Sequence, residues 1–98
     1  MGNTATNFDA TVSGGFENNA DGNYTAVGGG TNNTASGEWD VVSGGSGNTA
    51  GGEVSTIAGG QWNSVTGNGD LIAGGYEETL GQATRDNTKV AGNAAVGP

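Results

Sequence analysis

The sequence contains no cysteine and no histidine. Without cysteine, neither a disulfide nor a thiolate-bound metal can hold the fold together. Without histidine and cysteine, the nucleophile and base pairs of serine and cysteine hydrolases are also missing. A catalytic site would need Lys89 or a pair of carboxylates. We therefore expect no enzymatic activity, no metal and no cofactor.

Positive charge is nearly absent. Ten acidic residues stand against only Arg85 and Lys89, which gives a net charge of −8 and leaves residues 1–84 without a base. Nucleic-acid binding requires a basic surface, so we exclude nucleic acid as a partner. No apolar run approaches the roughly 18 residues of a membrane helix, and no apolar signal segment follows Met1. We therefore expect no membrane contact by this segment.

Large apolar side chains are also scarce. Only 32% of the residues are hydrophobic and 6% are aromatic, whereas 22 of the 98 are glycine. Such a composition ordinarily indicates disorder or low complexity. A chain with so few core-forming side chains buries little apolar area on its own. We therefore expect it to gain further burial by packing against copies of itself.

What the chain does contain is a strict 15-residue repeat. A glycine pair recurs at that interval, a β-branched residue precedes each pair by two positions, and an asparagine follows it. Repetition at a fixed short period is typical of solenoids, whose coils stack on one another. The repeat positions are Val12, Val27, Val42, Ile57 and Ile72 for the β-branched residue, Gly14, Gly29, Gly44, Gly59 and Gly74 for the first glycine, and Asn18, Asn33, Asn48 and Asn63 for the asparagine.

Each period holds two similar half-units, an aliphatic residue or an alanine followed two positions later by glycine, as at Val27 and Ala35. β-branched residues favour an extended backbone, and glycines supply the positive φ angles of tight turns. Asparagine is the commonest other residue at positive φ, and stacked asparagines can hydrogen-bond along a column. We predict an all-β fold, a parallel β-roll or β-solenoid of about five 15-residue coils.

The repeats also define the domain organisation. They occupy residues 1–83 and begin within a repeat, so we interpret Met1-Gly2 as an engineered start on a fragment. Residues 84–98 are predicted to form an irregular C-terminal cap or a junction. Val90 follows Ile72 by 18 positions rather than 15, which indicates an insertion of about three residues. Irregularity of this kind is expected at the end of a solenoid, where a bare coil invites edge-to-edge pairing.

The segments "NTASGEWDVVSGG" and "NTAGGEVSTIAGG" show both half-units in register. Over residues 3 to 83 the chain resembles the YadA-like head repeats of trimeric autotransporter adhesins, which also occur in related bacterial surface fibres and phage tail fibres. The resemblance implies a homotrimer of parallel β-rolls packed around a common axis. It also implies an extracellular location, at a cell surface or a fibre tip.

The chain departs from the family pattern in two respects. The usual head period is nearer fourteen than fifteen, and the neck motif, heptad stalk and membrane anchor of these adhesins are not found here. A surface adhesin, a phage fibre and another trimeric fibre tip therefore all stay open. The binding sites of the family do not share a motif, so no binding residue is transferred to this sequence.

Aromatic residues are the candidate ligand-binding residues. They are costly in a chain built mainly of glycine, asparagine, threonine and alanine, and on an outer surface they can stack on sugar rings or anchor a protein partner. The alternative is that they seal the grooves between chains of the trimer, which we favour. The candidates are Trp39, Trp62, Tyr24 and Tyr76.

One pair of carboxylates lies at equivalent positions of adjacent coils. Glu38 and Glu53 are separated by one full period of the repeat, so stacking brings them close together. Two such carboxylates can chelate a hard cation or serve as a glycosidase pair. We favour the simpler interpretation that both are solvated surface groups.

Taken together, these features predict a structural and adhesive module of a trimeric surface fibre or adhesin head, which projects and presents a multivalent binding surface. Its ligand would be a glycan or a surface protein of a host or prey cell. The alternatives are a carbohydrate-binding tip of a phage-like or predatory-type fibre and a structural spacer that binds no ligand.

Overall fold

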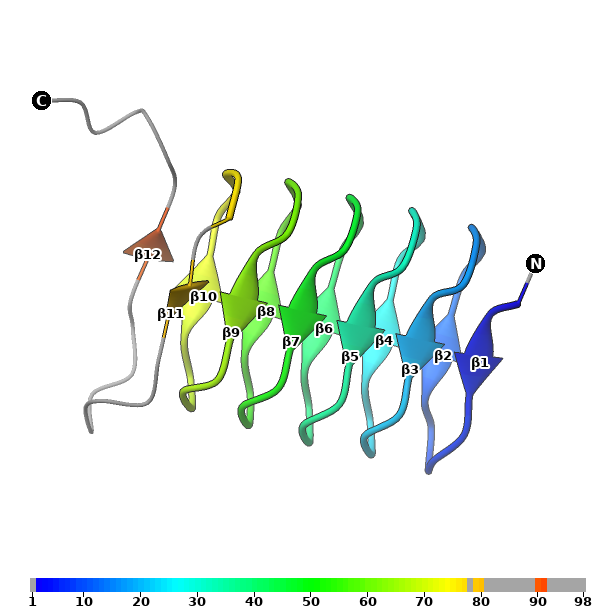
Figure 1. The fold of residues 1–98 in the computed structure, drawn as a ribbon. Coiled ribbons are helices and arrows are strands. Elements are labelled where there is room, and N and C mark those ends of the chain that lie inside the picture. The colour runs from blue at the N-terminus through cyan, green and yellow to red at the C-terminus, as the bar shows by residue number, and fades with distance from the viewer. Residues whose placement is uncertain (1, 78, 81–89, 92–98) are drawn as a thin grey trace, which may run out of the picture.

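The computed structural model is an all-β solenoid, in which the chain winds through about five stacked coils (Figure 1). It describes residues 2–77, 79–80 and 90–91. Within this part of the chain every strand is parallel to its neighbours, and equivalent residues pair across adjacent coils. The predicted parallel β-solenoid of about five 15-residue coils is therefore confirmed.

Each coil contributes one two-residue strand to each of two facing sheets. The first sheet contains β1 (Thr4–Ala5), β3 (Asn19–Ala20), β5 (Thr34–Ala35), β7 (Thr49–Ala50), β9 (Ser64–Val65) and β11 (Thr79–Leu80). The second sheet contains β2 (Thr11–Val12), β4 (Ala26–Val27), β6 (Val41–Val42), β8 (Thr56–Ile57), β10 (Leu71–Ile72) and β12 (Val90–Ala91).

Two kinds of turn join the sheets and form opposite edges of the solenoid. Five-residue turns, such as residues 21–25, lead from the first sheet to the second, and six-residue turns, such as residues 28–33, lead back. The two sets of turns lie at opposite ends of the strands in Figure 1. The six-residue turns carry a further ladder of parallel bridges, through Phe16, Thr31, Ser46, Gln61 and Tyr76.

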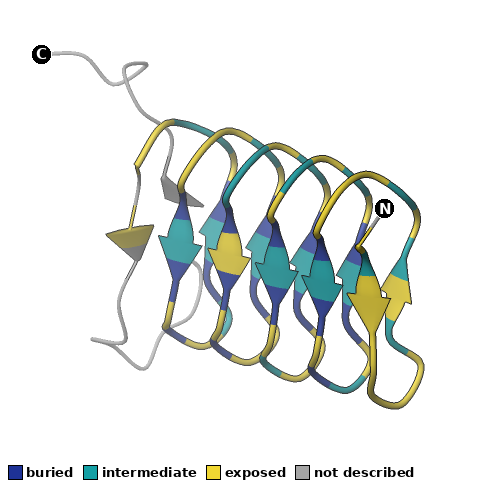
Figure 2. Cartoon of the chain, turned by 45° about the vertical axis from the view of Figure 1, so that its right-hand side comes forward, coloured by how far each residue is buried: buried dark blue, intermediate teal, exposed yellow. Residues whose placement is uncertain are grey.

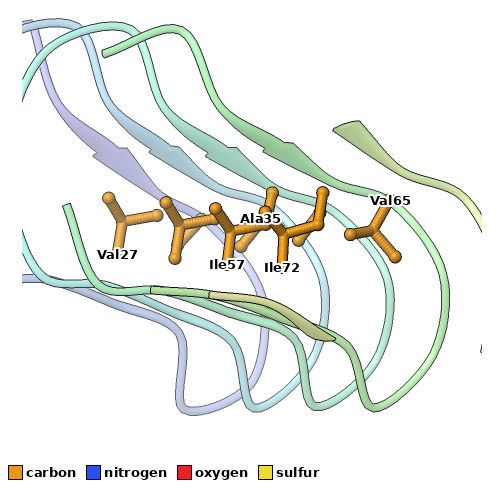
Figure 3. Packing of buried hydrophobic residues seen from close by; sticks show 8 residues of the cluster. Val27, Ala35, Ile57, Val65 and Ile72 are labelled. Carbon is orange, nitrogen blue, oxygen red and sulfur yellow. The ribbon is translucent and has the colours of Figure 1, made fainter. Parts of the chain in front are cut away.

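The core lies between the sheets and consists of two columns of small and β-branched side chains (Figure 3). Alternation along each strand turns its second residue inward. In strands β3 to β10 the first residue is therefore half-buried or exposed, and the second is buried. Alanines opposite valine and isoleucine keep the sheets close together. The first-sheet column is Ala20, Ala35, Ala50 and Val65, and the second-sheet column is Val27, Val42, Ile57 and Ile72.

The first coil is less buried than the coils that follow it (Figure 2). Ala5 is exposed and Val12 only half-buried, although both occupy inward positions of the repeat. The reason is that β1 and β2 are the end strands of their sheets, so no described coil covers them.

The asparagines of the repeat form a buried hydrogen-bonded ladder, as the sequence predicts. The backbone N–H of Asn48 donates to Oδ1 of Asn33, and that of Asn63 donates to Oδ1 of Asn48, each at 2.9 Å. The Asn48 amide donates to the carbonyl oxygens of Gly44 and Gly60 at 3.0 and 2.9 Å. Each asparagine thus ties three neighbouring backbone segments together.

Positive φ angles do not fall on these asparagines. They fall on the preceding residue, as at Trp62 with φ 58°, and on the second glycine of each pair, as at Gly45 with φ 96°. A Cβ on Gly45 would overlap the carbonyl oxygen of Gly60 in the next coil. The first glycine, such as Gly44, has nothing within 4 Å of an added Cβ. Its carbonyl accepts the asparagine bond instead.

The last described strand corrects the predicted insertion. Leu71 pairs with Val90 and Ile72 with Ala91, so the offset between paired positions is 19 rather than 18. The insertion is therefore one residue longer than the sequence indicated, because sheet pairing aligns Val90 with the outward-facing Leu71 and not with Ile72. The rest of the predicted segment 84–98 lies outside the described residues, so its interpretation as a cap or junction stays a prediction.

Candidate functional site: the aromatic edges

Tyr24 and Trp39 stack on each other along the edge formed by the five-residue turns. Their ring centroids are 4.3 Å apart and their planes differ by 13°. The stack arises because the residues are one period apart, at the same place in adjacent coils. Both have left-handed backbone conformations, with φ of 59° and 65°, and their side chains are exposed. The predicted column continues to Val54, also at positive φ and exposed.

Trp62 lies on the opposite edge, in a six-residue turn. A Cβ placed on Gly47 would lie 2.5 Å from Cε3 of Trp62, so the indole covers the position that a side chain at 47 would occupy. Tyr76 and Phe16 belong to the bridge ladder of the same edge. The four predicted ligand-binding residues thus form two pairs on opposite edges of the solenoid. Tyr24 and Trp39 lie on one edge, and Trp62 and Tyr76 lie on the other.

Seven large apolar side chains of the described residues lie outside the core, including all of the aromatic ones. Their exposed fractions run from 42% at Tyr24 to 73% at Phe8. Folding of a single chain therefore does not use them for burial. The set comprises Phe8, Phe16, Tyr24, Trp39, Val54, Trp62 and Tyr76. Phe8, Phe16 and Val54 were not among the predicted site residues. Phe8 and Val54 are identified by their positions in the five-residue turns, beside and within the Tyr24 column, and Phe16 by its place in the bridge ladder with Tyr76.

Asp40 is a buried carboxylate that the sequence analysis did not single out. It occupies the inward column of the five-residue turns, between Thr25 and Ser55. Burial raises its pKa from 3.8 to about 6, although N–H groups of Ser55 and Gly37 donate to it at 2.8 and 2.9 Å and lower the pKa. The negative charge of Glu53 raises the pKa further. The signal for this site is the period, which places Asp40 in one buried column with Thr25, Ser55 and Asp70.

Glu38 and Glu53 lie in consecutive five-residue turns, exposed to solvent, at the outer side of this column. Among residues 2–77 and the two described strands beyond, no three acidic groups come together in a way that would hold a metal ion. No helix long and apolar enough to cross a membrane occurs in the part of the chain that the structure describes.

The repeat residues are placed in the scaffold beneath these edges. The β-branched residues line the core, apart from the half-buried Val12 of the first coil, and the asparagines are buried in the ladder. None of the ladder asparagines offers its side chain to a ligand, since their amides bond to backbone carbonyls.

Comparison with known proteins does not identify the chain. A scan against protein-family models finds no match, and a search of curated proteins finds none either.

Proposed function

We propose that this chain is a structural and adhesive module of a trimeric surface fibre, of the kind represented by YadA-like head repeats. The observation that carries the proposal is the exposure of every described aromatic side chain on a rigid repetitive scaffold. Exposed aromatic residues in such number are typical of surfaces that contact a partner. The module would lie outside the cell, at a cell surface or a fibre tip.

The proposed mechanism is multivalent. Three identical chains around one axis present three copies of each aromatic edge at fixed separations. Simultaneous engagement raises the overall avidity even where each single contact is weak. A solenoid suits this role because its ladders of backbone bonds hold the edges in place along the whole rod.

The proposal is tested by screening the purified chain against immobilised glycans and matrix proteins, together with its native mass. Trp39→Ala separates the two roles of the aromatic edge. Loss of binding with an unchanged mass identifies a ligand site, whereas dissociation of the assembly identifies a seal between chains. Thr49→Ala, on the exposed face of the first sheet, is the control.

One observation favours the carbohydrate-binding alternative, and it concerns Trp62 rather than Trp39. The Tyr24 and Trp39 rings cover one face of each other, whereas Trp62 rests on the bare backbone of Gly47. Glycan binding that Trp62→Ala abolishes and Trp39→Ala preserves would support a carbohydrate-binding tip. Binding to neither class of ligand would favour the spacer.

A further inference from the structure

The outer face of the second sheet, like that of the first, carries no charged residue in any described strand. The acidic residues that the structure describes lie in the turns or at the ends of the turns. Six consecutive residues in each coil, which form a second-sheet strand and the first four positions of the following turn, contain no charged residue. We call this surface the uncharged band: residues 11–16, 26–31, 41–46, 56–61 and 71–76.

The two outer sheet faces differ in chemistry. The outward column of the first sheet is entirely polar, with Thr4, Asn19, Thr34, Thr49 and Ser64. The outward column of the second sheet is largely apolar, with Thr11, Ala26, Val41, Thr56 and Leu71. The next outward position adds Ala58 and Ala73, both exposed.

The glycines at the centre of the band are not required by the fold of one chain. An added Cβ on Gly14, Gly44, Gly59 or Gly74 would point into open space, and these four have no left-handed φ. By contrast, an added Cβ on the second glycine, Gly15, Gly30, Gly45 or Gly60, would overlap the backbone of the next coil. The bare backbone keeps the centre of the band flat, which permits close approach of another surface.

From this arrangement we infer that the uncharged band is the surface on which a second copy of this chain packs. The inference rests on the proposed assembly of identical chains and adds the face through which they meet. With a net charge of −8, two copies repel wherever carboxylates meet. Both outer sheet faces avoid such contacts, but only the band also offers apolar side chains and bare glycine backbone for a second copy to cover.

A second copy fits this face better than a foreign partner does. Another solenoid with the same coil spacing keeps its ridges in phase with the band over all five coils. A basic partner would instead be attracted to the acidic turns, where Glu38 and Glu53 are exposed. At the rim of the band Phe16 and Tyr76 are about half exposed and can cover the edge of such a contact.

The test introduces charge into the band without disturbing the fold. Gly44→Glu with Gly59→Glu introduces two carboxylates at positions where an added Cβ has no atom within 4 Å. The matched control, Thr34→Glu with Thr49→Glu, places the same charge on the outer face of the first sheet. Light scattering on a sizing column gives the mass of each, and far-UV circular dichroism reports the fold.

We expect the wild type and the control to remain assembled and the band variant to fall to the 9.5 kDa of one chain with an unchanged spectrum. An assembled band variant would overturn the inference, although the proposed trimer would stand. Equal dissociation of the band variant and the control would also overturn the inference, because charge on either face would then have the same effect. A wild type of two or four chains would contradict the trimer and leave the band testable by the same variants. A monomeric wild type would overturn both.

A second measurement covers the case in which the band variant does not fold. The chain has no cysteine, so a single introduced thiol is the only site for a short bis-maleimide. Ser43→Cys lies in the band and Ser36→Cys on the opposite side, and both positions are exposed. Covalent dimers should form with Ser43→Cys and not with Ser36→Cys. The reverse pattern would overturn the inference.

Discussion

Asp40 is the residue at which the fold and ordinary side-chain chemistry conflict most. Its side chain is inaccessible to solvent, and burial raises its pKa from 3.8 to about 6. Protonation is therefore easier in the folded chain than in the unfolded chain. The stability contributed by this group is fully present below pH 3.8 and is lost as pH rises through about 6.

We predict that Asp40 makes the solenoid less stable at pH 8 than at pH 4, by about 2 kcal/mol for a pKa difference of this size. Asp40→Asn cannot titrate and should flatten this part of the profile. Urea unfolding followed by circular dichroism at several pH values gives, for the wild type and for Asp40→Asn, the slope of the free energy of unfolding against pH. Asp9→Asn, at an exposed position, controls for the loss of one charge. Parallel profiles for wild type and Asp40→Asn would contradict the account of this site.

Asn48 tests the buried ladder. Asn48→Ala removes two bonds to glycine carbonyls and the acceptor for the N–H of Asn63. At about 1 kcal/mol for each lost bond, the free energy of unfolding should fall by about 3 kcal/mol. Asn19→Ala, which lies outside the ladder on the strand surface, should change it by less than about 0.5 kcal/mol. Equal effects in equilibrium unfolding would show that the ladder contributes no special stability.

Val54 tests backbone strain. It is a β-branched residue with φ 57°, whereas the equivalent position of the next coil is Gly69 with φ 71°. Because the left-handed region costs a side chain about 1 kcal/mol, we expect Val54→Gly to raise the melting temperature. Its side chain is largely exposed, so little packing is lost. Val41→Gly, in a strand, should lower the melting temperature. A lower melting temperature for Val54→Gly would contradict this account.

At the scale of one turn, the close approach of consecutive coils decides which glycines are essential. Gly45 has a left-handed backbone, and a Cβ there would overlap Gly60 of the next coil. Gly45→Ala should therefore cost more than about 3 kcal/mol or prevent folding. At Gly51 the nearest atoms lie 3.5 Å away, an ordinary contact, so Gly51→Ala should be close to neutral. Thermal melts of the two variants compare them directly, and similar melting temperatures would disprove the stacking argument.

The period of the sequence was sufficient to predict the coils, their inward columns and the asparagine ladder, because stacking repeats every contact at a fixed interval. Which glycine of each pair is constrained could not be predicted, since both recur with the same period and only the path of the backbone distinguishes them. The register of Val90 was also missed. An insertion removes the period, and the apolar Leu71 and Ile72 are then equally good partners in sequence.

The candidate site was only partly predictable for a related reason. The one-period spacing of Tyr24 and Trp39 placed them in one column, and the structure shows them stacked. The separation of Trp62 and Tyr76 onto the opposite edge follows from the turn lengths, which the repeat pattern alone does not specify. The burial of Asp40, and of Asp70 in the same column, went unrecognised because acidic residues in turns are ordinarily exposed and the period does not say which turn positions face inward.

At the scale of the whole molecule, the solenoid combines a core of alanine, valine and isoleucine with an exterior that carries every described aromatic ring. One sheet face is polar and the other largely apolar, neither carries a charged residue in its described strands, and the described acidic residues lie in the turns. This division suits a rod that joins copies of itself along one face and presents its remaining edges to a ligand.

The native mass of the purified chain, measured by light scattering on a sizing column over a range of concentrations, tests the proposed fibre module most directly. The account predicts a stable species of three chains, three times the 9.5 kDa of one. A well-folded species of 9.5 kDa at every concentration would contradict it, because the uncharged band would then have no second copy to cover it.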